Sequence, residues 1–335
     1  MSKSQDYIHT LKNQRIFITG GTGTLGVALV NKLLKHVHAS QITIYSRDEH
    51  KQLDLERKFP GVECLLGDVR DRDRLDDCIP GHDILIHLAA LKQLPRGESN
   101  ATEFTKTNIL GTENVLKSAT SNGVKQVLFV SSDKAVLPTS HYGSTKLSGE
   151  KLMQQYASRH TEANFPIVRL GNIWQSRGSI SELLSQSDLP RFISITDTEN
   201  SRFSISAAKS AEMLLEALRH SANCEIFIPK MYAFRLEDLV KAADLVNHEI
   251  VGLRPGERKH ELLASEKECS LVYENEQFYV LVPDNDSIAS RFFNEDQGFK
   301  RSTDKLNVNS EDAPKYSLQE LKIMLGKSAF VRDGV

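Results

Sequence analysis

The sequence is poor in cysteine and lacks the spacings at which cysteine and histidine hold a metal. Its four cysteines, Cys64, Cys78, Cys224 and Cys269, include no CxxC pair, and no histidine stands at metal-ligand spacing from them. This pattern predicts neither a zinc site nor a disulfide framework. We therefore expect free thiols in a reducing compartment and no bound metal.

Long apolar runs and an excess of charge of one sign are also missing. No run approaches the roughly 18 residues that span a bilayer, and the N-terminal MSKSQDYIHTLKNQ lacks the apolar core of a signal peptide. The 42 Lys and Arg nearly balance the 44 Asp and Glu, which leaves a formal net charge of −2. This balance favours neither nucleic acid nor an anionic membrane as a partner. We expect a cytoplasmic protein that binds anionic ligands through local groups.

Short apolar runs alternate with longer amphipathic segments from about residue 14 onward. Strands followed by helices form a parallel sheet with both faces covered, so the pattern predicts an α/β fold of the Rossmann-like, doubly wound type. Helices are predicted at 25–34 and 100–119. Strands are predicted at 15–19, 41–45, 62–66, 83–90, 124–132 and 165–170.

The alternation changes after about residue 175. Short strands at 225–229 and 278–283 stand among helices and polar loops, and 317–325 has the pattern of a helix with Ser317 as its N-cap. We predict a Rossmann domain over residues 1–175 and a smaller C-terminal substrate-binding part over residues 176–335. Some segments of the second part are expected to return to the Rossmann core.

A glycine-rich loop, TGGTGTLG at 19–26, joins the first strand to the first helix. Gly20 permits a tight turn, Gly23 lets the backbone approach a pyrophosphate, and Gly26 lets the helix pack against the sheet. The free N–H groups at the start of the helix face the anion. The position of the loop favours dinucleotide binding over a turn without a ligand, and its spacing resembles that of short-chain dehydrogenases/reductases. The expected contacts are Gly20, Thr22, Gly23, Thr24, Leu25 and Gly26.

The residues after the second strand predict NADP as the cofactor. An NAD site usually has an acidic residue there, which accepts a hydrogen bond from the ribose 2′-hydroxyl. This chain has Ser46 and Arg47, a hydroxyl and a guanidinium that suit a 2′-phosphate. The alternative is that SRDE only caps an exposed helix. Asp68 and Val69, after the third strand, match the place where such enzymes hold the adenine.

The end of the fifth predicted strand leads into a candidate catalytic group. Tyr142 and Lys146 are four residues apart, so they share one face of a helix. In short-chain dehydrogenases the tyrosine exchanges a proton with the reacting hydroxyl, while the lysine holds the ribose and lowers the pKa of the phenol. Ser132 supplies the hydroxyl expected beside the tyrosine.

Asp133 and Lys134 add an acid and a base that a simple dehydrogenase or epimerase does not need. A dehydratase does need them, because it removes a proton and expels a hydroxyl; the alternative is a surface ion pair. Neighbouring strand residues point to opposite faces, so the chain must turn here for both to reach a substrate. Lys134 can act as a base only in its neutral form. We expect Lys146, the nicotinamide and burial to lower its pKa, whereas Asp133 would raise it.

Several longer segments resemble the bacterial UDP-N-acetylglucosamine 4,6-dehydratases, an extended short-chain dehydrogenase/reductase family. The most similar branch is the 5-inverting type of the pseudaminic acid pathway. The resemblance covers most of residues 15–265. It rests on LGDVRD (66–71), HLAALKQLP (87–95), SSDKAVLPTSHYGSTK (131–146), RLGNIWQSRGS (169–179), ITDTENSRF (195–203), EIFIPK (225–230) and LRPGERKHE (253–261).

The resemblance implies further site residues and a homo-oligomer. It places Ala89, Ala90 and Thr107 at the cofactor and Arg177 near the cofactor or the diphosphate. The chain departs from the family pattern where Ser132 replaces Thr, Trp174 and Gln175 replace small residues, Ser204 replaces an aromatic residue, and Ser99 and Ala101 interrupt EYNP. The residues implied to hold the UDP-sugar are Lys92, Asn172, Thr196, Arg254 and Glu257.

The reaction implied by the resemblance is redox-neutral. Tyr142 accepts the 4-hydroxyl proton as hydride leaves C4 for NADP, and the resulting ketone acidifies the C5 proton. Lys134 removes that proton, Asp133 protonates the departing 6-hydroxyl, hydride returns to C6, and C5 is reprotonated with inversion. The alternatives are a C5-retaining 4,6-dehydratase, with UDP or another nucleotide, and a nucleotide-sugar epimerase. A further alternative is a catalytically silent NADP-binding scaffold or sensor.

Overall fold

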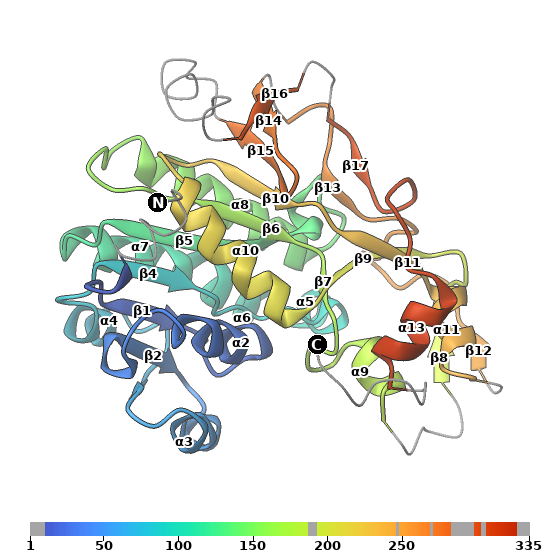
Figure 1. Cartoon of the computed structure of the whole chain (residues 1–335), viewed down its shortest axis with the longest axis horizontal. Coiled ribbons are helices and arrows are strands. Elements are labelled where there is room, and N and C mark those ends of the chain that lie inside the picture. The colour runs from blue at the N-terminus through green and yellow to red at the C-terminus, as the bar shows by residue number, and fades with distance from the viewer. Residues whose placement is uncertain are drawn as a thin grey trace.

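The computed structural model describes residues 11–186, 193–245, 248–268, 271–282, 298–302 and 306–326 (Figure 1). A ten-stranded sheet runs through its centre. From β10 to β3 all neighbouring strands are parallel, and β15, β14 and β16 extend the sheet antiparallel. The order across the sheet is β16 (Lys300–Arg301), β14 (Leu271–Glu274), β15 (Phe278–Val282), β10 (Ile226–Pro229), β6 (Ile167–Leu170), β5 (Gln126–Ser132), β4 (Ile84–His87), β1 (Ile16–Thr19), β2 (Ile42–Ser46) and β3 (Glu63–Leu66).

This sheet confirms the predicted Rossmann-like α/β fold. The central strands are mainly apolar and are buried along their whole length, as parallel strands covered by helices should be. In Figure 1, α10 (Ala207–His220) and α2 (Thr24–Leu33) cover the face toward the viewer. On the other face α4 (Arg72–Cys78), α7 (Gly111–Ser121) and α8 (His141–Ala157) pack together. The remaining elements of this part are η1 (Ala39–Gln41), α3 (Glu49–Lys58), α5 (Leu94–Ser99) and η3 (Asp133–Ala135).

The helix predicted at 100–119 contains a π-helical segment. It forms as α6 (Ala101–Phe104), the π segment η2 (Thr105–Leu110) and then α7. Segments of this kind are frequent at functional sites. Here the segment turns Asn108 inward, where its amide bonds both backbone groups of Leu91 and the hydroxyl of Thr145. The irregularity therefore ties the helix that carries Tyr142 to the loop after β4.

A second hydrophobic core lies beyond the carboxyl ends of the parallel strands. It includes Trp174, Ile195, Phe234, Leu239 and Leu321. Around this core lie the pair β8 (Ile193–Ile195) with β12 (His248–Ile250) and the helices α9 (Ile180–Leu184), α11 (Leu236–Ala242) and α13 (Leu318–Met324). A sheet of β7 (Asn172–Ile173), β9 (Ser201–Ile205) and β11 (Tyr232–Arg235) and the pair β13 (Leu262–Ala264) with β17 (Val308–Asn309) pack mainly against the first core.

The late elements match the sequence-based expectations. The predicted strands at 225–229 and 278–283 both join the main sheet, and Pro283 lies outside the described residues. Ser317 caps α13 as predicted, with Glu320 completing a capping box.

Two departures from the family pattern anchor this last helix. The indole of Trp174 donates to the Met324 carbonyl at 3.1 Å, and its ring packs edge-on against Phe234. Gln175 has a φ of 52°, and its side-chain amide donates to the Met324 carbonyl at 3.4 Å and to Ser185 at 2.7 Å. Trp174 and Gln175 therefore connect α13 to the segment that continues into Ser176 and Arg177.

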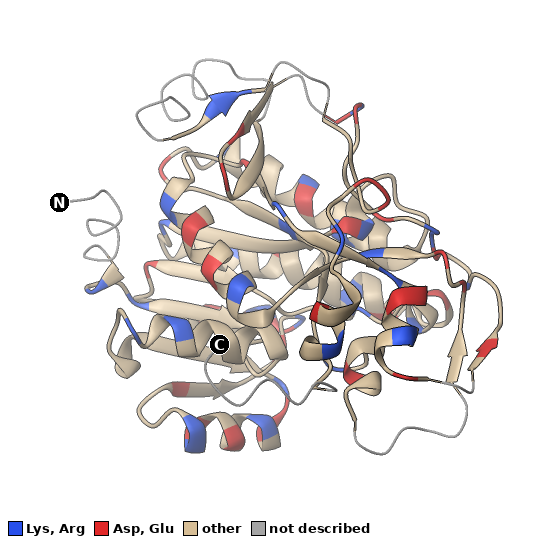
Figure 2. Cartoon of the chain, turned by 45° about the vertical axis from the view of Figure 1, so that its right-hand side comes forward, with Lys and Arg blue, Asp and Glu red and all other residues tan. Residues whose placement is uncertain are grey.

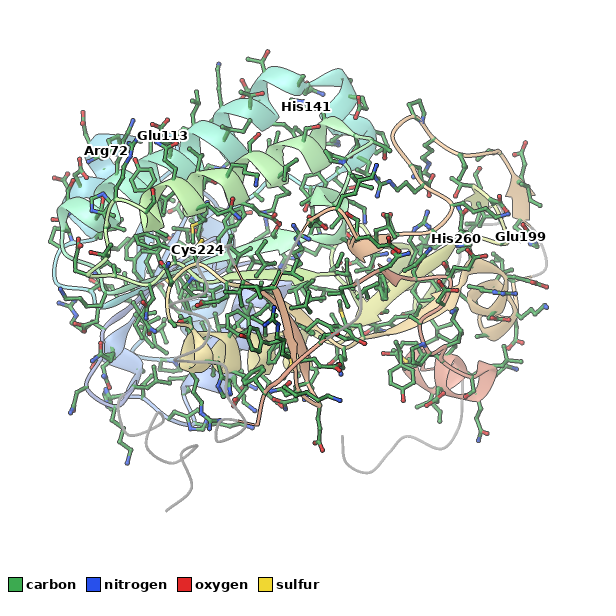
Figure 3. All side chains as sticks on the ribbon, turned by 90° about the horizontal axis from the view of Figure 1, so that it is seen from above. Arg72, Glu113, His141, Glu199, Cys224 and His260 are labelled. Atoms are coloured by element: carbon green, nitrogen blue, oxygen red, sulfur yellow. The ribbon has the colours of Figure 1, made fainter. Side chains whose placement is uncertain are left out.

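Charged residues of both signs are interspersed along the elements (Figure 2). No helix of the described residues is long and apolar enough to cross a membrane, and no three of their His, Cys, Asp or Glu side chains are grouped to hold a metal ion. Cys64, Cys78 and Cys224 are free thiols, the last buried among packed side chains (Figure 3). Cys269 and residues 1–10, on which the signal-peptide prediction largely rests, lie outside the described residues.

Candidate active site

A cavity of about 1210 Å³ opens at the carboxyl ends of the parallel strands. It includes the loops after β1 and β4, the two strands between which the chain reverses its direction of travel across the sheet. Ligands of open α/β sheets bind at such a switch point. Every predicted site residue lines this cavity except Asp133. The glycine loop, the tyrosine and lysine of α8 and the residues implied to hold the sugar thus share one space.

The geometry of the glycine loop fits a dinucleotide. A Cβ on Gly20, which has a φ of +69°, would lie 2.7 Å from the Ala89 nitrogen, and a Cβ on Gly26 would lie 2.2 Å from the Gly21 oxygen. A Cβ on Gly23 would contact only the Gly20 oxygen, at 3.3 Å. Gly23 is the N-cap of α2 and gives it no side-chain cap, so the first N–H groups are free to bind an anion. The Thr107 hydroxyl, which belongs to the same lining, is buried without a hydrogen-bond partner.

Two glycine substitutions should separate cofactor binding from folding. Gly23→Ala should fold normally but bind dinucleotide at least tenfold more weakly, because its methyl group enters the space that the pyrophosphate needs. Gly26→Ala should lower the melting temperature, since its methyl group collides with backbone. Cofactor titration and thermal unfolding measure the two effects. Unchanged cofactor affinity in Gly23→Ala would place the pyrophosphate elsewhere.

The candidate 2′-phosphate site lies at the end of β2. Ser46 is buried and its hydroxyl accepts from the Gln52 amide at 3.0 Å, which leaves its own proton available to a ligand. The segment SRDE does cap α3, but it does so through Asp48 and not through Ser46. The Arg47 guanidinium, about half exposed, lies 3.3 Å from the Asp68 carboxylate. Burial by itself would raise the pKa of Asp68. Hydrogen bonds from Arg70 and the positive charge of Arg47 have the larger effect, and the pKa of Asp68 is lowered.

Tyr142 and Lys146 are buried on α8. Burial raises the pKa of Tyr142 above its ordinary value. The charge of Lys134 and a hydrogen bond with Ser132 act in the opposite direction but do not outweigh burial. The cation that acts on the phenol is thus Lys134, where the sequence had indicated Lys146. Lys146 donates to the Val130 carbonyl at 2.5 Å, and burial lowers its pKa to about 7 against the opposing charge of Glu150.

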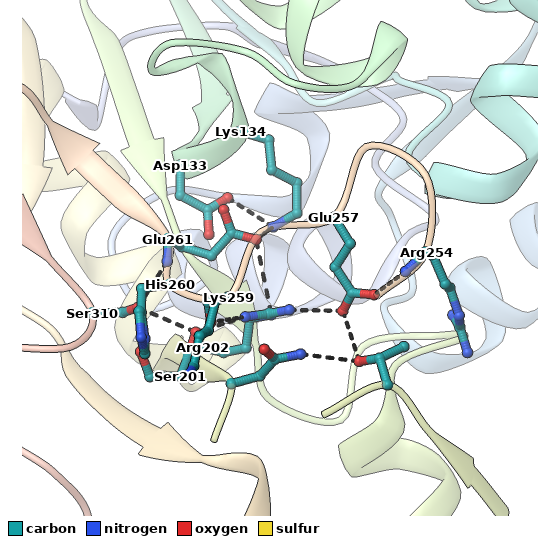
Figure 4. Close-up of polar contacts among 12 residues, drawn as sticks. Asp133, Lys134, Ser201, Arg202, Arg254, Glu257, Lys259, His260, Glu261 and Ser310 are labelled. Carbon is teal, nitrogen blue, oxygen red and sulfur yellow. Dashed lines mark hydrogen bonds and ion pairs between the residues drawn. The ribbon is translucent and has the colours of Figure 1, made fainter. Parts of the chain in front are cut away.

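Lys134 is held between two carboxylates (Figure 4). The chain turns at η3, as the sequence required, and the Lys134 ammonium lies 3.0 Å from Asp133 Oδ1 and 3.3 Å from Glu261 Oε1. Burial disfavours the ammonium, but both carboxylates favour it more strongly, and the pKa of Lys134 is raised. The prediction of a lowered pKa is therefore wrong, because it did not include Glu261.

Asp133 lies behind the wall of the cavity. Its side chain is 1% exposed, and its Oδ1 accepts from the Ser132 hydroxyl at 2.7 Å as well as from Lys134. Glu261 and Arg202, which the sequence analysis did not select, do line the cavity. Both lie in segments that carry the family resemblance, and this was the available signal.

Three of the residues implied to hold the sugar, Thr196, Arg254 and Glu257, form a connected polar wall. Glu257 accepts from Arg202 at 2.7 Å and from the Thr196 hydroxyl at 3.1 Å, and also from the Arg254 backbone. Lys92, also in the lining, donates to Ser176 at 3.2 Å, and burial lowers the pKa of Lys92. Within the described residues, the guanidinium groups of Arg177 and Arg254 form no ion pair. Two such cations in a cavity suit a diphosphate.

Residues 16–283 match the family described as "Polysaccharide biosynthesis protein". A UDP-N-acetylglucosamine 4,6-dehydratase (inverting) from Campylobacter jejuni is 38% identical over 277 residues, covering 81% of this chain and 83% of its own. A UDP-glucose 4-epimerase from Rickettsia massiliae is 33% identical and covers 96% and 98%. The crystal structure titled Pen, from Bacillus thuringiensis, is 30% identical, with a TM-score of 0.86 and coverage of 95% and 98%. These matches confirm the resemblance, and the chain belongs to this polysaccharide biosynthesis protein family.

Proposed function

We propose that the chain is an NADP-dependent UDP-N-acetylglucosamine 4,6-dehydratase that inverts C5. The observation that carries this proposal is the pairing of Lys134 with buried carboxylates in the cavity that also holds Tyr142 and Lys146. Similarity to the Campylobacter jejuni dehydratase supports the same reaction and sugar. The proposal includes a cytoplasmic location and a homo-oligomer.

The residues divide the reaction between them. Bound NADP supplies the acceptor for hydride from C4 and the donor that returns it to C6. Tyr142, next to Ser132, takes the proton of the 4-hydroxyl, and Lys146 holds the ribose. Lys134 removes the C5 proton once C4 is a ketone, and it must first pass its own proton to a neighbouring carboxylate. A carboxyl group of the same cluster protonates the departing 6-hydroxyl, a role that the sequence gives to Asp133.

A second candidate is a nucleotide-sugar 4-epimerase. The Rickettsia relatives with that name cover nearly the whole chain, which favours it. An epimerase exchanges hydride at C4 alone, however, and gives no role to a lysine between two carboxylates.

Incubation with UDP-N-acetylglucosamine in deuterated water distinguishes these functions. We expect a 4-keto-6-deoxy sugar with inverted C5 and deuterium at C5, formed without added oxidant or reductant because the cofactor is regenerated. NMR of the product reads both features. An epimerase would give the C4 epimer with its 6-hydroxyl intact, a retaining dehydratase would keep the C5 configuration, and a silent scaffold would give no product.

Reversing the charge at position 47 tests the cofactor. Arg47→Asp should weaken NADP binding by ~1.5–3 kcal/mol, roughly 10- to 100-fold, and leave NAD binding closer to unchanged. Arg57→Asp is the control, because it makes the same charge change on α3 at a side chain that is 77% exposed and outside the cavity. The preference of this variant for NADP over NAD should equal that of the wild type. Isothermal titration calorimetry measures both affinities. A wild type that binds NAD and NADP equally would remove NADP from the proposal.

A further inference from the structure

The two carboxylates that flank Lys134 differ in their position relative to the cavity. Glu261 belongs to the cavity lining, whereas Asp133 does not. Both are almost fully buried, and each has one oxygen without a hydrogen-bond partner, Asp133 Oδ2 and Glu261 Oε2. Of the two, therefore, Glu261 alone combines an oxygen without a hydrogen-bond partner with a place in the lining of the cavity.

Neighbouring elements fix the position of Glu261. It immediately precedes β13, which packs against the turn η3 that carries Lys134. Its backbone N–H donates to the Ser310 hydroxyl at 2.8 Å, and its Oε1 lies 3.3 Å from the Lys134 ammonium and 3.8 Å from Arg202 Nε. Asp133, by contrast, uses its Oδ1 to hold both Ser132 and Lys134 from behind. This arrangement gives Asp133 a positioning role.

We infer that Glu261 is the general acid that protonates the departing 6-hydroxyl, with Lys134 as its partner base. The inference rests on the proposed dehydratase function. It assigns to Glu261 the acid role that the sequence gives to Asp133. In the reactive state the shared proton lies on Glu261, so Lys134 is a neutral amine and Glu261 a neutral acid. The C5–H bond then breaks toward Lys134, its electron pair forms the C5–C6 double bond, and the C6–O bond breaks as Glu261 gives its proton to the oxygen.

This step balances without an outside acid or base. The pair begins with one proton on the carboxyl group and ends with one on the amine, which restores the ion pair of the resting structure. One water molecule leaves, and no electrons are exchanged with another group. A sugar that fills the cavity removes water from the pair, which penalises the charged form and favours the neutral one.

The test compares two leaving groups in Glu261→Gln. The natural substrate expels hydroxide unless an acid assists, whereas UDP-6-deoxy-6-fluoro-N-acetylglucosamine expels fluoride, a far weaker base. Elimination from the natural substrate should fall ~10²–10⁴-fold in Glu261→Gln. Elimination from the fluoro analogue should stay within about tenfold of wild type, since a general acid contributes little to fluoride departure. Loss of the Glu261 charge lowers the pKa of Lys134, so the amine can pass its proton to Asp133 or to water and still remove the C5 proton.

Two further variants and a folding control complete the test. Glu261→Asp keeps an acid and should recover part of the rate with the natural substrate. Asp133→Asn should lose rate on both substrates alike, as a positioning residue would. Cofactor titration and thermal unfolding establish that each variant is folded, independently of turnover.

The inference is overturned if Glu261→Gln loses both substrates equally, or if the selective rescue by fluoride appears in Asp133→Asn instead. Near wild-type rates of Glu261→Gln on both substrates would overturn it too. A wild type that makes no 6-deoxy product from UDP-N-acetylglucosamine contradicts the proposed function itself, and the inference with it.

Discussion

A Lys134→Arg enzyme should oxidise the sugar but release no 6-deoxy product. Arginine preserves a positive charge near Asp133 and Glu261 and so maintains the electrostatics of the cluster. It cannot be deprotonated in a protein, however, so it cannot remove the C5 proton. Addition of substrate should convert part of the bound NADP to NADPH, seen as nicotinamide absorbance. Turnover to the 4-keto-6-deoxy sugar should fall ~10²–10⁴-fold.

Two companion variants locate the block. Lys134→Ala should also oxidise the sugar without releasing 6-deoxy product. It should be less stable than Lys134→Arg, because two buried carboxylates then lie together without their cation. Tyr142→Phe should fail earlier, with little NADPH formed, since the 4-hydroxyl proton has no acceptor. Product formation by Lys134→Arg at near wild-type rate would remove Lys134 as the base, and the epimerase alternative would then be favoured.

The parts of the site that are continuous in sequence could be predicted from it. The glycine loop and the pair Tyr142 and Lys146 each lie within eight or fewer consecutive residues, so local spacing alone relates them to one helix or one turn. The strands that carry them are apolar runs long enough to recognise without a partner. These motifs also lie at strand ends, and parallel strands bring such ends to one edge of the sheet.

The charge state of Lys134 could not be predicted in this way. It depends on Glu261, which lies 127 positions after Lys134 in the sequence. Glu261 comes close to Lys134 only because β13 packs against η3. The sequence showed Asp133 as a neighbour of Lys134 but not the second carboxylate, and this reversed the direction of the pKa shift. In the same way, the departures from the family pattern at Trp174 and Gln175 are explained only by the folded structure, where both side chains bond the Met324 carbonyl of α13.

One buried ion pair, between Arg169 and Glu150, connects the main sheet to the catalytic helix. Arg169 on β6 donates twice to the Glu150 carboxylate on α8, at 2.8 and 2.7 Å, and also reaches Glu268 at 2.7 Å. The side chains of Arg169 and Glu150 are 1% and 2% exposed. Glu150 is one helical turn beyond Lys146, so this pair holds the helix face that carries the catalytic residues.

Arg169→Met should destabilise the protein by ~3–5 kcal/mol, the usual cost of removing one partner of a buried ion pair. The cost arises because the Glu150 carboxylate stays in the interior without its cation, whereas Glu268 is 20% exposed and can turn toward water. The double variant Arg169→Met, Glu150→Leu removes both charges and should recover most of the loss, since apolar side chains of similar volume often replace such pairs without a net cost. Arg57→Met, at a side chain 77% exposed, serves as the matched control and should stay within ~0.5 kcal/mol of wild type. Urea unfolding followed by circular dichroism measures all three. A double variant as unstable as Arg169→Met alone would mean that the packing of the arginine stem, and not the stranded carboxylate, accounts for the loss.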